Sequence, residues 1–289
     1  MLINVVLAGL TLGSIYALMA VSLTVAYRPT NVFNLAHGLF FTIGGMTAAT
    51  LAGAGWNWFL AAGAALVLVA AVATVCWFTA IAPVLRFGTG SAMWIISTLA
   101  FELIGENING KIWTDEPRSL PPPLGLSTAD IGGRAISTYG IAVIVLVVAL
   151  VVALEFGYRS SQGRAVLAVF EDRDAAMLRG INVTAVSAGS VIAGGVIAGL
   201  AGVLAAPLLF ASLGSAFPIL ISAFAAAVVG GLGSLRGALL GGLIVAFVEN
   251  FAIRAFSPGI QLLSTFLIVM VVLLAKPRGL FGRAVVRQV

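Results

Sequence analysis

Two pairs of polar residues have the types and the spacing to do chemistry within an otherwise apolar chain. His37 follows Asn34 by three residues, and Glu106 follows Glu102 by four. At these spacings both members of a pair lie on one face of a helix. Such groups could line a pathway for a polar solute, and the carboxylates could also bind the ammonium group of a zwitterion. All four residues are therefore pathway candidates.

Each pair also has a structural interpretation. Asn34 and His37 stand near the start of an apolar segment, where their side chains would satisfy free backbone groups as a helix begins, and we favour this interpretation. Glu102 and Glu106 could instead lie at the outer membrane interface with Lys111 as their partner. For the two carboxylates both interpretations stay open.

A further acidic residue, Glu249, has different neighbours. Asn250 follows it directly, and Arg254 stands five residues later. A carboxylate at membrane depth needs a partner, and a nearby arginine is a natural one. The sequence therefore predicts a structural ion pair near the outer end of this segment rather than a substrate site.

The remaining residue types exclude most enzyme chemistry. The chain has one histidine and one cysteine, and it contains no Ser-His-Asp set, no H-E-x-x-H motif and no paired carboxylates beside a nucleophile. Cys76 is the single cysteine and has no intrachain partner for a disulfide. We expect a protein that is not an enzyme and that binds no metal or cofactor.

The composition indicates which elements must position these residues. Hydrophobic residues make up 61% of the 289 residues and charged residues only 9%, and the mean hydropathy is +1.15. A soluble domain has about 25% charged residues, and apolar blocks of roughly 17–25 residues are long enough to cross a bilayer. The chain is therefore expected to be an all-α polytopic membrane protein.

The apolar blocks predict a bundle of about 8–10 transmembrane helices. No basic region precedes the first block, so we expect no cleaved signal peptide. Pairs of glycines four residues apart are expected to let helices pack closely. The nine predicted spans are 3–26, 32–54, 58–82, 91–107, 138–156, 184–212, 217–230, 238–254 and 259–275.

The distribution of basic residues predicts the orientation. Cytoplasmic loops carry an excess of lysine and arginine, and two segments have this excess: 157–183, and the tail that starts at Lys276. With nine crossings, the amino terminus and the Pro-rich segment 108–137 then lie outside the cell and the carboxyl terminus lies in the cytoplasm. Eight or ten crossings remain alternatives.

The segment 160–181 is predicted to form two short helices at the cytoplasmic membrane surface. An apolar patch up to Phe170 is followed by charged residues of both signs, with Asp172 suited to cap a helix start and Gly180 suited to end a helix. The apolar face is too small to drive strong lipid binding, so a groove on another protein fits better. A solvated loop is the alternative.

Nothing in the sequence is suited to bind ATP. The motif G-x-x-x-x-G-K-[ST] is absent, and Gly230, Gly233 and Gly237 fit no standard phosphate-binding spacing. If ATP drives transport, another chain must bind it. The basic residues stand at span ends and in loops, so we expect a lipid bilayer around the protein and no nucleic-acid partner.

Three segments together resemble the permeases of branched-chain amino acid importers, the LivH-type subunits of ABC transporters. The resemblance covers nearly the whole chain, in the order found in the family. The segments are Gly9–Ala20 running into Asn34–Gly38; Gly163–Ala165 through Glu171–Asp172 to Gly180–Asn182; and Gly230–Gly241 with Glu249–Asn250 and the tail Pro277–Gly282.

This resemblance implies a single permease domain over residues 1–289, with 160–181 as a cytoplasmic coupling loop that sits in a groove of an ATPase. It further implies as partners a second homologous permease subunit, two ABC ATPase subunits and an extracytoplasmic solute-binding protein. The location implied is a bacterial or archaeal cell membrane. The coupling residues implied are Gly163, Arg164, Phe170, Glu171, Asp172, Arg173 and Gly180.

The implied small-molecule substrate is a branched-chain amino acid. Urea, short amides and other amino acids are alternatives, because members of the same family carry them. An ion-coupled secondary transporter or a channel is the alternative from another class. Such a carrier is expected to have inverted repeats and ionisable residues near the membrane midplane, and we find no convincing repeat in the sequence.

Overall fold

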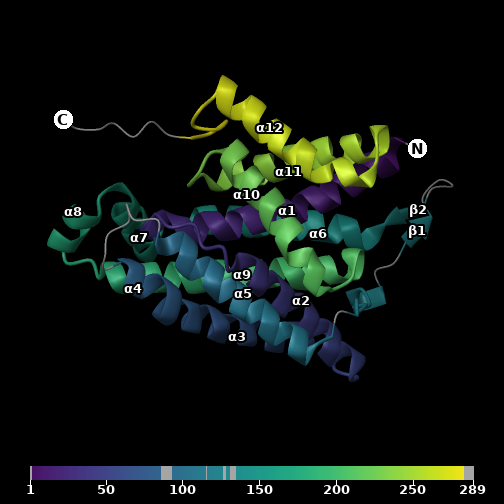
Figure 1. Ribbon diagram of the computed structural model, residues 1–289, viewed down its shortest axis with the longest axis horizontal. Helices are drawn as coiled ribbons and strands as arrows, with labels where there is room; N and C mark the ends of the chain where they lie inside the picture. Colours follow the sequence, from purple (N-terminus) through teal and green to yellow (C-terminus); the bar gives the residue numbers. More distant parts are fainter. Residues whose placement is uncertain (1, 86–92, 115, 126–127, 131–134, 283–289) are drawn as a thin grey trace.

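The apolar runs form long helices that lie side by side in one elongated bundle (Figure 1). The computed structural model describes residues 2–85, 93–114, 116–125, 128–130 and 135–282. Each of the nine predicted spans corresponds to a helix, which confirms that these runs are helical. The helices are α1 (Leu2–Thr30), α2 (His37–Gly53), α3 (Trp58–Cys76), α5 (Met93–Ile112), α6 (Thr138–Gly157), α9 (Val183–Leu209), α10 (Ala216–Gly230), α11 (Leu235–Ala255) and α12 (Gln261–Ala275).

Six segments of the described chain are long and apolar enough to cross a membrane, and this confirms the all-α polytopic class. One of them is α3 together with a π-helical turn (Trp77–Ile81) and α4 (Ala82–Leu85). Two other helices are short, since α2 has 17 residues and α12 has 15. The helix α5 carries Glu102, Glu106 and Lys111. The number of crossings therefore stays a prediction.

Glycines bring the helices close together, as their spacing predicts. A methyl group on Gly202 of α9 would overlap the carbonyl oxygen of Phe41 in α2, and one on Gly44 of α2 would overlap the backbone of Gly199. The helices α10 and α11 approach each other in the same way at Gly230 and Gly237. In lipid the hydrophobic effect drives little helix association, so this close backbone packing is a main source of cohesion.

The two ends of the bundle differ. One end, called here the α7 end, holds α7 (Ser161–Glu171), α8 (Arg173–Leu178) and the tail 276–282. The opposite end, called the β end, holds the start of α1 and two short antiparallel strands, β1 (Thr128–Asp130) and β2 (Ala135–Ser137). This small hairpin and the short helix η2 (Pro123–Gly125) lie within the segment 108–137, for which no regular structure was predicted.

The segment between α5 and α6 is held against the β end of the bundle. The backbone of Arg118 pairs with that of Ala211 through two hydrogen bonds of 2.8 and 2.9 Å. The Arg118 guanidinium also donates to the Thr50 hydroxyl at 3.0 Å, and Leu120 is buried. This segment therefore packs against the carboxyl-terminal end of α2 and the α9–α10 connection.

Glu249 does not form the predicted ion pair with Arg254, so that prediction is wrong. Its carboxylate is fully buried and accepts hydrogen bonds from Tyr16 at 2.8 Å and Ser222 at 2.7 Å. Gln261 and Thr265 also donate to it, whereas Arg254 is exposed. The spacing along α11 was misleading because these donors come from α1, α10 and α12, which the sequence separates widely.

Candidate coupling and pathway sites

The helix α7 begins with a side-chain cap. The hydroxyl of Ser160 accepts a hydrogen bond from the backbone N–H of Gly163 at 3.1 Å, which satisfies one free donor of the first turn. A side chain at Gly163 would collide with the backbone of Gly157 and Tyr158, so glycine lets α7 turn sharply away from the end of α6. Arg164 donates to the carbonyl oxygen of Arg159 at 2.8 Å and braces the same turn.

The helix α8 has both caps that the sequence predicts. The carboxylate of Asp172 accepts from the backbone N–H groups of Asp174 at 3.0 Å and Ala175 at 2.9 Å. At the other end Gly180 has a φ of +79°, and the N–H of Ile181 donates to the carbonyl oxygen of Ala176 at 3.1 Å. This is the Schellman arrangement that ends many helices. The capping predictions for Asp172 and Gly180 are confirmed.

A small apolar cluster holds α7 and α8 against the start of α9. Val169 of α7, Ala176 of α8 and Val183 of α9 are each at least 96% buried, since their exposed fractions are 4%, 2% and 4%. Half-buried neighbours such as Ile181 pack around them. The two short helices therefore form one unit that is attached to the bundle rather than a solvated loop.

The outer face of this unit presents apolar and charged groups together. Leu178 is 90% exposed and Met177 is 51% exposed, and Glu171 and Asp172 are exposed beside them, while Arg173 is half-buried. We define these residues, 171–173 and 177–178, as the α8 face. The family resemblance implied coupling roles for the three charged residues of this face and none for Met177 and Leu178. Their position at the end of a short helix, two and three residues before Gly180, is a signal that could have found them.

Asn34 and His37 lie in and after a non-helical stretch that is buried inside the bundle. Their exposed fractions are 2% and 0%. The Nδ1 atom of His37 lies 2.9 Å from the carbonyl oxygen of Asn34, and the Asn34 side chain accepts from the N–H of Ala36 at 3.0 Å. Both side chains thus contact the backbone where α2 begins, as the structural interpretation expects. A role in the pathway stays a prediction.

Glu102 lies at the same place, although it belongs to α5. Its carboxylate accepts a hydrogen bond from the N–H of Leu39 at 2.9 Å, so it caps the first turn of α2 from a neighbouring helix. A side chain at Gly38 would collide with the same carboxylate. Glu106 is half-buried one turn farther along α5, and Lys111 is exposed. The structure therefore brings Asn34, His37 and Glu102 together at the start of α2, and Glu106 lies beside Glu102 one turn farther along α5.

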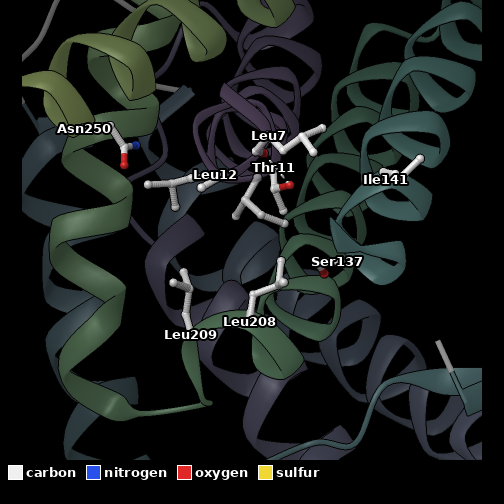
Figure 2. Close-up of a pocket in the computed structure, with 10 residues that line it drawn as sticks. Leu7, Thr11, Leu12, Ser137, Ile141, Leu208, Leu209 and Asn250 are labelled. Atoms are coloured by element: carbon white, nitrogen blue, oxygen red, sulfur yellow. Dashed lines mark hydrogen bonds between the residues drawn. The ribbon is translucent and has the colours of Figure 1, made fainter. Parts of the chain in front are cut away.

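A cavity of about 400 Å³ lies near the β end between α1, α6, α9 and α11 (Figure 2). Most of its lining is aliphatic. The polar groups that reach it are already engaged locally, since Thr11 donates to Leu7 at 2.8 Å and Asn250 donates to Ala246 at 2.9 Å. The lining residues are Leu7, Ala8, Thr11, Leu12, Ile15, Ser137, Ile141, Leu208, Leu209 and Asn250.

Comparison with solved structures finds one chain of similar fold. The chain aligns with a chain of PsaBC from Streptococcus pneumoniae, solved in complex with a Fab, with a TM-score of 0.52 and 13% sequence identity. The alignment covers 94% of this chain and 92% of the other. At this identity the likeness concerns the fold alone.

Comparisons of sequence are more specific. The chain is 31% identical to the high-affinity branched-chain amino acid transport system permease protein BraD of Pseudomonas aeruginosa and 29% identical to LivH of Escherichia coli. Each alignment covers 97% of this chain and 96% of the relative. The family model for the branched-chain amino acid transport system permease component matches residues 5–275. Because that match spans nearly the whole chain, the protein belongs to this family of membrane permease components.

Proposed function

We propose that the chain is one of two transmembrane permease subunits of an ATP-driven importer. A second, similar permease completes the pathway, two ATPase subunits bind at the α7 end, and a solute-binding protein delivers substrate at the β end. The proposal also gives the unit of α7 and α8 the role of the coupling loop within a single permease domain. Membership of the family supports this assembly, and the sequence resembles that family over the same range.

The α8 face is the observation that carries the proposal. Leu178 is 90% exposed, and a partner surface that covered it would remove its apolar side chain from water. Acidic and basic side chains surround it, so hydrocarbon is an unsuitable environment and a groove on a protein is a suitable one. Both caps and the apolar cluster beneath make the unit rigid. A rigid unit can transmit a movement of the chain that binds it.

The charges of the two ends support the proposed orientation. Cytoplasmic ends of membrane proteins carry more lysine and arginine than the opposite ends. At the β end the described basic residues are Lys111, Arg118 and Arg254. At the α7 end they are Arg28, Arg159, Arg164, Arg173, Arg179, Arg236, Lys276 and Arg278. This asymmetry favours a cytoplasmic α7 end, and with it a cytoplasmic carboxyl terminus in a multi-pass protein.

The proposed substrate is a branched-chain amino acid. The named relatives are permeases for that class of solute. The cavity near the β end is lined mainly by aliphatic side chains, and it lies where substrate would arrive from outside. Isothermal titration of the cognate binding protein with leucine, urea and acetamide distinguishes this substrate from the alternatives.

Gentle purification of the chain from its native membrane tests the assembly. We expect mass spectrometry to identify a second permease and two ATPase chains in the same complex. ATP hydrolysis by that complex should rise when loaded binding protein is added. A chain that is recovered folded and alone, or only with copies of itself, would contradict the proposal and favour a secondary carrier.

A substitution at the α8 face tests where the ATPases bind. Leu178→Asp places a charge where an apolar contact is proposed, and loss of such a central contact costs about 2 kcal/mol or more. We therefore expect markedly less of the ATPase subunits to copurify with the permease. The matched control is Leu124→Asp at the β end, where Leu124 is 82% exposed. If both variants lost the ATPase subunits to the same extent, or if neither lost them, the α8 face would be excluded as the binding surface.

A second variant addresses the charges. Replacing Glu171, Asp172 and Arg173 by Gln, Asn and Gln removes the charges while Asn keeps the ability to cap α8. We expect the complex to hydrolyse ATP with little transport. Exposed Glu116 at the β end, replaced by Gln, serves as the control. Normal transport in the triple variant would overturn the role given to these charges.

A further inference from the structure

The inner side of α7 contacts a loop that joins two membrane helices. Phe170 of α7 lies against Gly233, in the connection between α10 and α11, so closely that a methyl group on Gly233 would lie 2.9 Å from the Phe170 ring. Gly233 also has a φ of +82°, which residues with a side chain rarely adopt. The Phe170 ring meets the ring of Tyr27 in α1 edge-on at 6.4 Å. One aromatic side chain therefore touches both α1 and the α10–α11 loop.

Arg28 ties the same loop to α1 and to the end of α6. Its Nε–H donates to the carbonyl oxygen of Gly233 at 2.8 Å. Its guanidinium also lies over the ring of Tyr158, 4.3 Å from the ring centre. Arg28 is in the last turn of α1, and Tyr158 caps the end of α6. A single arginine thus joins α1, the end of α6 and the α10–α11 loop.

The carboxyl-terminal tail holds this loop from another direction. The N–H groups of Leu280 and Phe281 donate to the carbonyl oxygens of Val229 and Gly230, both at 2.9 Å. The first turn of α11 is also capped, since the Ser234 hydroxyl accepts from the N–H of Gly237 at 3.0 Å. With these contacts on several sides, the loop has little freedom to absorb a displacement of Phe170.

We propose that Phe170, Gly233 and Arg28 form a rigid joint that transmits the movement of α7 and α8 to α1, α10 and α11. The proposal rests on the proposed function, because the movement begins with an ATPase bound at the α8 face. In this arrangement Arg28 is a positioning residue: it touches neither ATPase nor substrate, and it keeps the loop seated on α7. Without it, α7 moves and the membrane helices do not follow.

Arg28→Lys is the informative substitution. Lysine keeps the positive charge, and with it the orientation of α1, but it lacks the planar guanidinium that bonds Gly233 and stacks on Tyr158 together. In the complete transporter in liposomes, we expect ATP hydrolysis to continue while the amount of substrate moved per ATP falls about ten-fold, a typical strength for coupling between sites. The matched control is Arg159→Lys, because the Arg159 guanidinium lies over the ring of Phe156, in the same turn of chain.

A double variant distinguishes a shared joint from two independent effects on the structure. Phe170→Leu is expected to lower transport per ATP as Arg28→Lys does, and both act on the Gly233 loop. The double variant should then be no worse than the more affected single variant, whereas independent effects would multiply. The proposed joint would be overturned if the two effects on transport per ATP multiplied in the double variant. It would also be overturned if Arg28→Lys left transport per ATP unchanged. A wild-type complex with no ATPase response to loaded binding protein would instead contradict the proposed function itself.

Discussion

Replacing Glu249 by alanine is expected to cause a large loss of stability, on the order of 3 kcal/mol. The carboxylate is fully buried and accepts from donors on three other helices: Tyr16 on α1, Ser222 on α10, and Gln261 and Thr265 on α12. Without it, these donors remain in an apolar interior, where each unpaired group costs about 1–3 kcal/mol. Partial rebonding keeps the total below their sum, because Thr265 also lies 3.1 Å from the carbonyl oxygen of Gln261.

We expect the thermal midpoint of the detergent-solubilised protein to fall by about 10 °C. Size-exclusion chromatography of samples heated to a series of temperatures measures this midpoint. Tyr16→Phe removes one donor and leaves the carboxylate three others, so its effect should be about 1 kcal/mol. Glu106→Ala is the matched control, since Glu106 is a half-buried glutamate on α5. An unchanged midpoint in Glu249→Ala would mean that this cluster does not hold the four helices together.

Gly202→Leu is expected to prevent the protein from folding to a stable bundle. Even a methyl group at Gly202 would overlap the carbonyl oxygen of Phe41 on α2. The obstacle is backbone, which cannot yield as a flexible side chain would, so α2 and α9 must move apart. Overpacking of a tight core costs about 1–3 kcal/mol and sometimes more, and separating these helices also removes the contacts around the start of α2.

Gly189→Leu on the same helix is the control for this substitution. A Cβ at Gly189 meets nothing within 4 Å, and the residue is exposed. Both variants replace a glycine of α9 by leucine, so their helix propensities change alike. We expect normal folded yield for Gly189→Leu and little monodisperse protein for Gly202→Leu, measured by fluorescence-detected chromatography. Similar yields for the two would show that the α2–α9 contact can relax.

Several features of this protein were predictable from the sequence because they depend on near neighbours along the chain. An apolar run of sufficient length becomes a helix in a bilayer, since every backbone group must be satisfied within the segment. Asp172 and Gly180 cap α8 through contacts to residues at most five positions away. The pairs of glycines four residues apart also indicated that helices pack closely. The family resemblance, which depends on the order of short motifs, was likewise available from the sequence.

Other features were decided only by the tertiary structure. Glu249 has a nearby arginine in the sequence, yet its carboxylate bonds to Tyr16, 233 residues away along the chain. Glu102 was open to two interpretations, and it caps the start of α2 because α5 packs beside that helix. The contact of Phe170 with Gly233 joins segments that no periodicity relates. Spacing within one helix cannot reveal such partners, because hydrogen bonds between helices depend on which faces meet, and packing of the whole bundle sets that choice.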